Sequence, residues 1–166
     1  MRNCLIDFKE IRDARGALIS LENNKNIPFE IKRVYYLYDL NKEPRGFHAH
    51  KKLKQILICL SGSCEVLLDD GVEKKIFFLN NPAQGLLVSE MVWREMSNFS
   101  EGCVLMVLAS EYYDEADYFR KYEDFLLSTK NSNHCLERGG YEAFGYFIGR
   151  EFVKPRGLRK NEGNEA

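Results

Sequence analysis

Short runs rich in β-branched, aromatic and leucine residues recur between about residues 17 and 109, with turn residues between them. The runs lie at 17–22, 31–40, 53–60, 64–69, 73–79, 85–90, 92–97 and 103–110. The turns SGS at 61–63 and DDG at 69–71 supply glycine where a tight hairpin needs a positive φ. Closely spaced strands of this kind favour a β-sandwich or β-barrel over an array of βαβ units.

The pattern changes after Ser110. The segment EYYDEADYFRKYEDFLLSTK is acidic at its start and carries apolar residues at helical spacing, which predicts a helix from about 114 to 128, packed outside the barrel. From Asn131 onward the chain is mostly polar and glycine-rich, and its last ten residues are GLRKNEGNEA. We therefore expect one domain over residues 1–130 and a partly disordered extension over residues 131–166.

Composition limits the function classes. With 24 basic and 25 acidic residues the chain has no global field that would recruit nucleic acid or an anionic membrane, so an anionic ligand must be held by a few placed arginines. The five cysteines are scattered without zinc-site spacing, which suits a reducing compartment. The N-terminus is charged from the start, and no run of about 18 apolar residues occurs. These features predict a soluble cytoplasmic protein without membrane, nucleic-acid or metal partners.

Two of the three histidines, His48 and His50, are one residue apart and leave the same face of an extended strand. Buried polar groups need partners, so a histidine pair is more consistent with a pocket than with a core. The spacing from this pair to Gln55 and then to Gly62 resembles the first sequence motif of the cupin β-barrels. The resemblance implies an all-β cupin, or jelly-roll β-barrel, here with a C-terminal helix.

Metal-binding cupins carry a glutamate where this chain has Gln55, and a further histidine in a second motif. The corresponding region NNPAQGLLVSEMVWREM keeps Pro82 and Gly85 but contains no histidine. Two imidazoles and an amide are fewer ligands than a divalent transition metal usually takes, so we expect no metal. An acidic residue such as Glu90 or Glu95 completing a metal site remains the alternative.

The string RGFH at 45–48 resembles the RGxH element of the dTDP-sugar 3,5-epimerases, and DARG at 13–16 is similar to their N-terminal DxRG element. From about residue 4 to 128 the chain resembles the dTDP-4-keto-6-deoxyglucose 3,4-ketoisomerases more closely still. That resemblance implies a dTDP-linked keto sugar as substrate, enediol chemistry without a cofactor, and a homodimer with exchanged N-terminal strands. The RG of DARG is the version associated with a galacto-configured 3-keto product.

The resemblance assigns His48 as the base at C3 and His50 as the partner that returns a proton, although these two roles could be exchanged. Proton transfer suits imidazole, which titrates near neutral pH. Tyr36, on the same strand parity as Tyr38, is our candidate donor to the enediolate oxygen, and Tyr35 takes that place if the register shifts by one residue.

Arg45 and Arg15 are expected to hold the diphosphate, since a planar guanidinium matches phosphate oxygens. Trp93 and Arg94 fall on opposite faces of one strand, so one of the two is expected to line the pocket near the base or the sugar. Arg15 would complete the site of the neighbouring subunit.

Three other functions stay open at this point: a 3,5-epimerase, a non-catalytic module that binds a nucleotide sugar, and a metal-dependent oxygenase. The histidine pair favours the ketoisomerase, because an epimerase is expected to carry a separate histidine with a carboxylate partner and a binding module needs no histidine pair.

Overall fold

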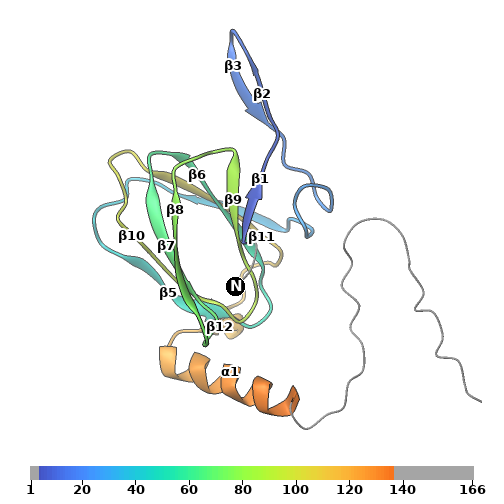
Figure 1. Ribbon diagram of the computed structural model, residues 1–166, viewed down its shortest axis with the longest axis vertical. Helices are drawn as coiled ribbons and strands as arrows, with labels where there is room; N and C mark the ends of the chain where they lie inside the picture. The colour runs from blue at the N-terminus through green and yellow to red at the C-terminus, as the bar shows by residue number, and fades with distance from the viewer. Residues whose placement is uncertain (1–3, 137–166) are drawn as a thin grey trace, which may run out of the picture.

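The computed structural model describes residues 4–136, and the side chains of residues 4–130. Two five-stranded antiparallel sheets pack face to face as a barrel (Figure 1). In spatial order the first sheet contains β1 (Leu5–Asp7), β9 (Gln84–Val88), β6 (Gln55–Ser61), β11 (Val104–Ala109) and β4 (Arg33–Leu37). The second contains β12 (Tyr118–Phe119), β5 (Arg45–His50), β10 (Trp93–Ser97), β7 (Cys64–Asp69) and β8 (Lys74–Leu79). The predicted all-β barrel is confirmed.

The core lies between the sheets because the strands alternate apolar side chains inward. On β7, Val66 and Leu68 are buried, whereas Glu65 and Leu67, which alternate with them, are partly exposed. Strand β6 differs, since its first five residues are all buried. Its outward face is covered by Phe8, Ile27 and Phe29. A central strand covered on both faces appears in the sequence as a continuous apolar run, as residues 56–60 (ILICL) do.

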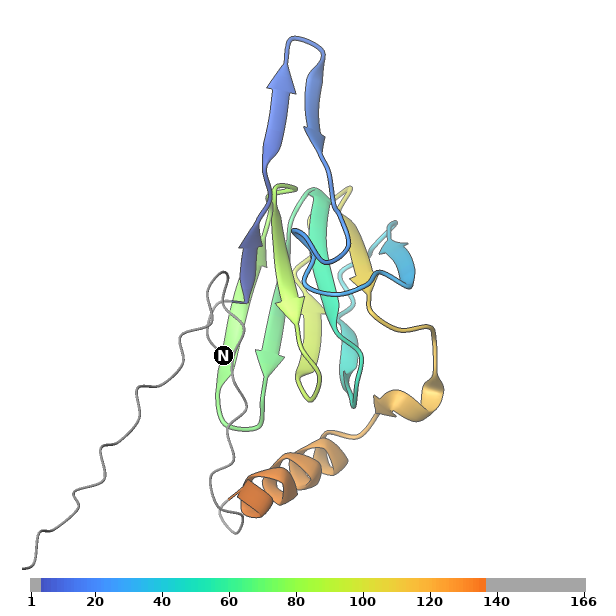
Figure 2. The ribbon, with the colours of Figure 1, turned by 90° about the vertical axis from the view of Figure 1, so that its right-hand side faces the viewer.

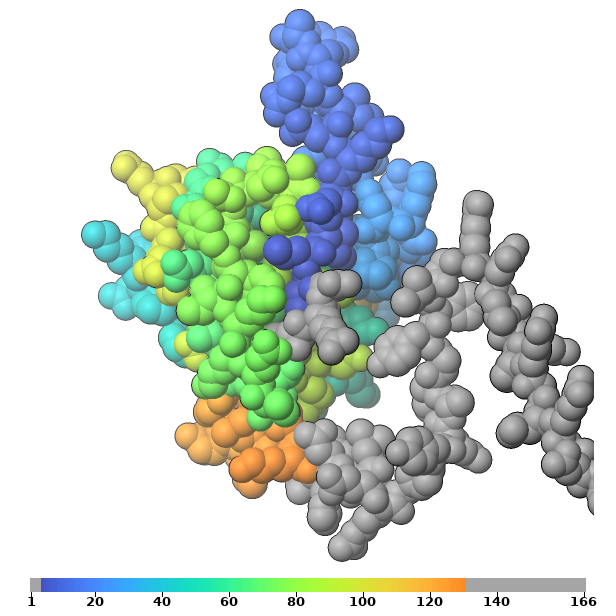
Figure 3. All heavy atoms as spheres, in the orientation of Figure 1, coloured from blue at the N-terminus to red at the C-terminus, as the bar shows by residue number. Residues whose placement is uncertain are grey.

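A short hairpin, β2 (Glu10–Asp13) and β3 (Gly16–Ile19), stands beyond one end of the barrel (Figures 1 and 2). Its strands pair Ile11 with Leu18, and these two side chains are 58% and 57% exposed. In the space-filling view the blue hairpin projects clear of the barrel (Figure 3). The hairpin therefore carries apolar surface that no side chain of residues 4–130 covers.

The predicted helix begins later than expected. Asp114 instead caps a short 3₁₀ helix, η1 (Glu115–Asp117), by accepting the N–H of Ala116. The chain then pairs β12 with β5, which places Tyr118 opposite His50. Helix α1 (Tyr122–Leu136) follows and continues past Lys130 into the predicted extension. The expected start at 114 is wrong because sheet pairing and the Asp114 cap take the backbone groups that a helix would need.

Helix α1 packs outside the barrel, as the sequence predicts, across the end opposite the hairpin (Figures 1 and 2). Its anchor is Phe125, which is fully buried against Ala49 and Trp93. Neither α1 nor η1, the helices of the described residues, is long and apolar enough to cross a membrane. The predicted extension beyond Leu136 lies outside the described residues.

Candidate active site

A cavity of about 350 Å³ opens between the two sheets. Four arginines contribute to its wall, from strands β4, β5 and β10 and from the segment after β12: Arg33, Arg45, Arg94 and Arg120. The rest of the lining is largely apolar, with Leu37, Leu57, Met96 and Val107. A cationic rim over an apolar interior fits an anionic ligand that carries a less polar end.

The two histidines and Arg94 form one hydrogen-bonded unit. The Nη2 atom of Arg94 lies 2.7 Å from Nε2 of His48 and 2.7 Å from Nε2 of His50. A guanidinium nitrogen only donates, so both Nε2 atoms accept and carry no proton. Each Nδ1 then carries the ring proton: that of His48 donates to the Gly46 carbonyl at 2.7 Å, and that of His50 donates to Oδ2 of Asp117 at 3.0 Å.

The backbone of β5 is bent to bring this unit together. Pairing between β10 and β5 shifts register between Arg94 and Glu95, and on β5 both Gly46 and Phe47 have positive φ, 99° and 52°. A Cβ on Gly46 would lie 2.8 Å from the Arg94 carbonyl oxygen, so only glycine fits there without a backbone shift. The irregularity places His48 directly opposite Arg94.

Both imidazoles are neutral at ordinary pH. Burial, and after it the positive charge of Arg94, lowers the pKa of His48 to about 4 and that of His50 to about 2. Burial also lowers the pKa of Arg94, which is 3% exposed. The site therefore presents two basic Nε2 lone pairs held by a shared cation.

A second layer, which sequence reasoning missed, fixes the rings. Oδ1 of Asp117 accepts the backbone N–H of Lys52 at 2.9 Å, which leaves Oδ2 aimed at His50. The Tyr118 ring centroid lies 4.2 Å from that of His50, and the Arg120 guanidinium stacks on Tyr118 at 3.9 Å. These residues lie in the segment for which the sequence pattern predicted a helix, so no local pattern pointed to the site.

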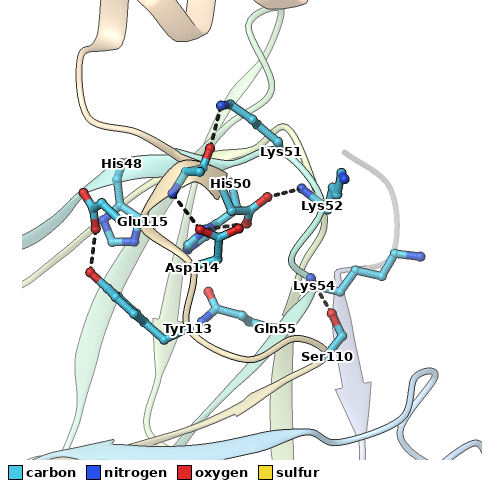
Figure 4. A network of polar contacts seen from close by, with 12 residues as sticks. His48, His50, Lys51, Lys52, Lys54, Gln55, Ser110, Tyr113, Asp114 and Glu115 are labelled. Carbon is cyan, nitrogen blue, oxygen red and sulfur yellow. Dashed lines mark hydrogen bonds and ion pairs between the residues drawn. The ribbon is translucent and has the colours of Figure 1, made fainter.

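Glu115 holds this layer in place. Its carboxylate accepts two hydrogen bonds from Arg120, at 2.9 and 2.8 Å. It accepts a third from the Tyr113 hydroxyl at 2.6 Å (Figure 4). The segment from Tyr113 to Arg120 therefore forms a connected wall over the histidines.

The tyrosine prediction is corrected. Tyr36 is 64% exposed on the outer face of β4, where its ring contacts that of Tyr38. Tyr35 lines the pocket instead, and its hydroxyl accepts a hydrogen bond from Nε2 of Gln55 at 2.8 Å. The reason is register, because Tyr35 pairs with Val107, which is buried and also lines the pocket.

Trp93 and Arg94 do lie on opposite faces, and it is Arg94 that reaches the pocket. Trp93 packs under α1 with its ring 5.2 Å from that of Tyr122, and its Nε1 donates to Glu95 at 2.9 Å. Trp93 does not line the pocket, because its indole packs against Phe125 of α1 instead.

Of the two expected phosphate ligands, Arg45 lines the pocket. Arg15 does not line the pocket of its own chain. It lies at the tip of the β2–β3 hairpin with its side chain 90% exposed and pairs with Asp13.

The residues near the histidines do not fit a divalent metal. Both Nε2 lone pairs point at the Arg94 cation, and the Gln55 side chain bonds Tyr35. The acidic alternatives are used elsewhere, since Glu95 accepts from Trp93 and Glu90 lies 3.9 Å from the Lys54 ammonium. A guanidinium between two imidazoles repels a second cation.

The neutral histidines predict a specific acid sensitivity. In the unfolded chain each imidazole takes up a proton near pH 6.5, whereas in the folded protein His48 does so near 4 and His50 near 2. Unfolding below pH 6.5 is therefore coupled to proton uptake, and the stability that both groups contribute at neutral pH falls as the pH falls. The double variant His48→Asn/His50→Asn should lose up to about two protons of this uptake.

The measurement is urea unfolding of both proteins between about pH 7 and about pH 4.5, where the slope of the unfolding free energy against pH counts the protons. The wild-type slope should exceed that of the double variant. Equal slopes would mean that the folded protein already holds charged histidines.

The whole barrel and its pocket have known relatives. The model of the family FdtA: WxcM-like, C-terminal matches residues 1–130. A TDP-4-oxo-6-deoxy-alpha-D-glucose-3,4-oxoisomerase from Aneurinibacillus thermoaerophilus is 60% identical over 141 residues, 84% of this chain and 100% of the relative. The sugar 3,4-ketoisomerase QdtA from Thermoanaerobacterium thermosaccharolyticum, solved with TDP, is 50% identical with a TM-score of 0.77, over 80% of this chain and 98% of that one.

The TDP-quinovose 3,4-ketoisomerase WlaRB from Campylobacter jejuni is 53% identical with a TM-score of 0.74, over 76% of this chain and 99% of that one. The family match spans the barrel, the histidine pair and the segment that covers it. The chain therefore belongs to the FdtA (WxcM-like, C-terminal) family of sugar 3,4-ketoisomerases.

Proposed function

We propose that this chain is a 3,4-ketoisomerase that moves the carbonyl of TDP-4-keto-6-deoxyglucose from C4 to C3. The observation that carries the proposal is the unit of two neutral imidazoles that share one guanidinium at the wall of an arginine-rich pocket. Enediol chemistry needs a base, a group that returns the proton and a cation near the developing oxyanion, and this unit supplies all three.

In the proposed reaction the C4 ketone oxygen of the substrate takes over the hydrogen bond that Arg94 gives to Nε2 of His48. The freed Nε2 then removes the proton from C3, which the C4 ketone acidifies. The electrons of that C–H bond form the C3–C4 double bond, and the ketone oxygen becomes the enediolate oxygen. The O3 proton then moves to O4, and protonation at C4 leaves the ketone at C3 and a hydroxyl at C4. The lining of the pocket favours His48 as the base, since His48 faces the cavity while His50 is 1% exposed behind it.

The substrate itself would tune the base. A pKa of about 4 makes His48 a weak base in the empty pocket, where burial and Arg94 disfavour its charged form. Diphosphate oxygens bound by Arg45, with Arg33 and Arg120 on the same wall, would bring negative charge into the cavity and raise that pKa. Proton abstraction would then be coupled to binding of the nucleotide.

Tyr35 is the proposed donor to the enediolate. Its oxygen accepts from Gln55, so its own proton is free to point into the pocket that it lines. We therefore assign to Tyr35, the alternative named from the sequence, the donor role that was predicted for Tyr36.

The main test is turnover of TDP-4-keto-6-deoxyglucose in deuterated buffer, followed by NMR. Deuterium should appear at C4 with the carbonyl at C3. His48→Asn and His50→Asn should each lower kcat by about 10²- to 10⁴-fold while TDP still binds. Retained turnover in both variants would contradict the assignment and leave a module that only binds the nucleotide sugar.

The same spectra test the second candidate, a 3,5-epimerase. Asp117 gives His50 the carboxylate partner that an epimerase is expected to have, although the sequence did not reveal it. Deuterium at C5 would indicate epimerisation in place of ketoisomerisation. The coupling of H4 reports the configuration of the product, for which DARG at 13–16 leads us to propose the galacto form.

A matched tyrosine pair tests the corrected donor. Tyr35→Phe removes the hydroxyl inside the pocket and should lower kcat by about 10²- to 10³-fold with a smaller change in KM. Tyr36→Phe removes the neighbouring hydroxyl on the outer face and should leave kcat close to wild type. Steady-state kinetics of both variants test the assignment. A large loss of kcat in Tyr36→Phe with little change in Tyr35→Phe would restore Tyr36 as the donor.

We further propose a cytoplasmic homodimer in which the β2–β3 hairpins are exchanged and Arg15 completes the partner's pocket. The exposed Ile11 and Leu18 and the exposed Arg15 guanidinium support an intermolecular role. Cell fractionation tests the location.

Mixed dimers test the exchange. Arg15→Ala and His48→Asn are each expected to have low activity, yet a mixed dimer contains one site with neither change. Co-expression of the two variants should therefore restore about a quarter of the wild-type activity, because about half of randomly formed dimers are mixed and each has one intact site of two. Activity no higher than that of the separate variants would contradict the exchange.

A further inference from the structure

Two cysteines from successive strands and a third, about 40 residues further along the chain, meet inside the barrel. Cys59 lies on β6, Cys64 begins β7 and Cys103 immediately precedes β11. Their Sγ atoms all lie within 4.8 Å of one another, and each residue is at most 1% exposed. The cluster is separate from the histidine unit and has no part in the proposed reaction.

Two loops hold the three thiols together. The turn after β6 and the loop before β11 are joined by hydrogen bonds in both directions between Ser63 and Ser100, at 2.8 and 2.9 Å. Gly62, with φ of 70°, packs so closely that a Cβ there would lie 3.0 Å from the Cα of Cys103. Such close packing leaves the sulfur positions little freedom.

The surroundings of the thiols are apolar. The cysteines belong to the main core together with Leu57, Val66, Phe99 and Leu105. The Cys59 thiol donates to the carbonyls of the adjacent turn, at 3.2 Å to Ser61 and 3.4 Å to Gly62. Within residues 4–130 no fourth histidine, cysteine or carboxylate joins the group.

This composition selects a particular class of ligand. Thiolates prefer soft ions, and the tetrahedral geometry usual for structural zinc needs a fourth ligand that the described residues do not provide. Among the soft ions that can bind three thiolates, the net charge of the complex favours one class, because an uncompensated charge is costly in an apolar core. A monovalent or divalent ion on three thiolates would leave the cluster negative, whereas a trivalent ion gives a neutral complex.

We propose that Cys59, Cys64 and Cys103 form a binding site for a trivalent thiophilic metalloid, of which arsenic(III) is the probe. Binding is a ligand exchange without redox change. Arsenous acid, As(OH)₃, loses its three hydroxyl groups, each of which leaves as water with one thiol proton, and three As–S bonds form. The resulting trigonal complex is uncharged and matches the burial of the site.

The test uses a variant that keeps only the cluster thiols, Cys4→Ala/Cys135→Ala, incubated with arsenite until uptake is complete. Native mass spectrometry should show one arsenic per chain with the loss of three hydrogens, and the melting temperature should rise, because a ligand that binds the folded state stabilises it. All three thiols should then resist alkylation.

A matched control adds Cys103→Ala to the same background. Its circular dichroism reports folding, and it should lose the three-hydrogen adduct. The proposal is overturned if the three-thiol protein takes up no arsenic, if its adduct loses only two hydrogens, or if the Cys103→Ala control gives the same adduct. The proposal is also overturned if the reduced protein takes up no arsenic and mild oxidation forms a disulfide between two of the cluster thiols. The cluster would then be a redox pair and not a metalloid site.

Discussion

The structure of the site depends on one buried guanidinium that donates to two imidazoles at once. Arg94 lies 2.7 Å from Nε2 of His48 and of His50, and those two bonds decide the tautomer, the charge and the orientation of both rings. A buried cation needs partners, and here the partners are neutral bases in place of carboxylates. Because Arg94 can only donate, both Nε2 atoms must be unprotonated to accept its hydrogen bonds. If Arg94 were paired with a carboxylate instead, it would place no such requirement on the histidines.

The barrel is built around this contact. Strand β5 leaves regular geometry at Gly46 and Phe47, and β10 shifts its register next to Arg94, so that the guanidinium and both rings share one level. Irregular strands of this type commonly mark functional sites, because they aim side chains that a regular strand would direct elsewhere. The segment from Tyr113 to Arg120 then covers the rings through strand pairing and stacking.

One apolar core inside the barrel adjoins two chemically different sites, the ligand pocket and the thiol cluster. Leu57 on β6 lines the cavity, and Cys59, two residues along the same face, belongs to the thiol cluster. One apolar layer therefore supports both the ligand pocket and the three cysteines. Substitutions in this layer, such as at Leu57 or Met96, would act on both.

The sequence by itself determined the strand pattern, the barrel class, the helix outside it and the histidine pair, because periodicity and local motifs carry that information. Tertiary structure alone decided that Tyr35 and not Tyr36 faces the pocket, since register belongs to a strand pair and not to one strand. The site also needs Asp117, which lies 67 residues from His50, and the thiol cluster unites three separate strand ends. Contacts between such distant residues exist only once the sheets have paired, so no local pattern encodes them.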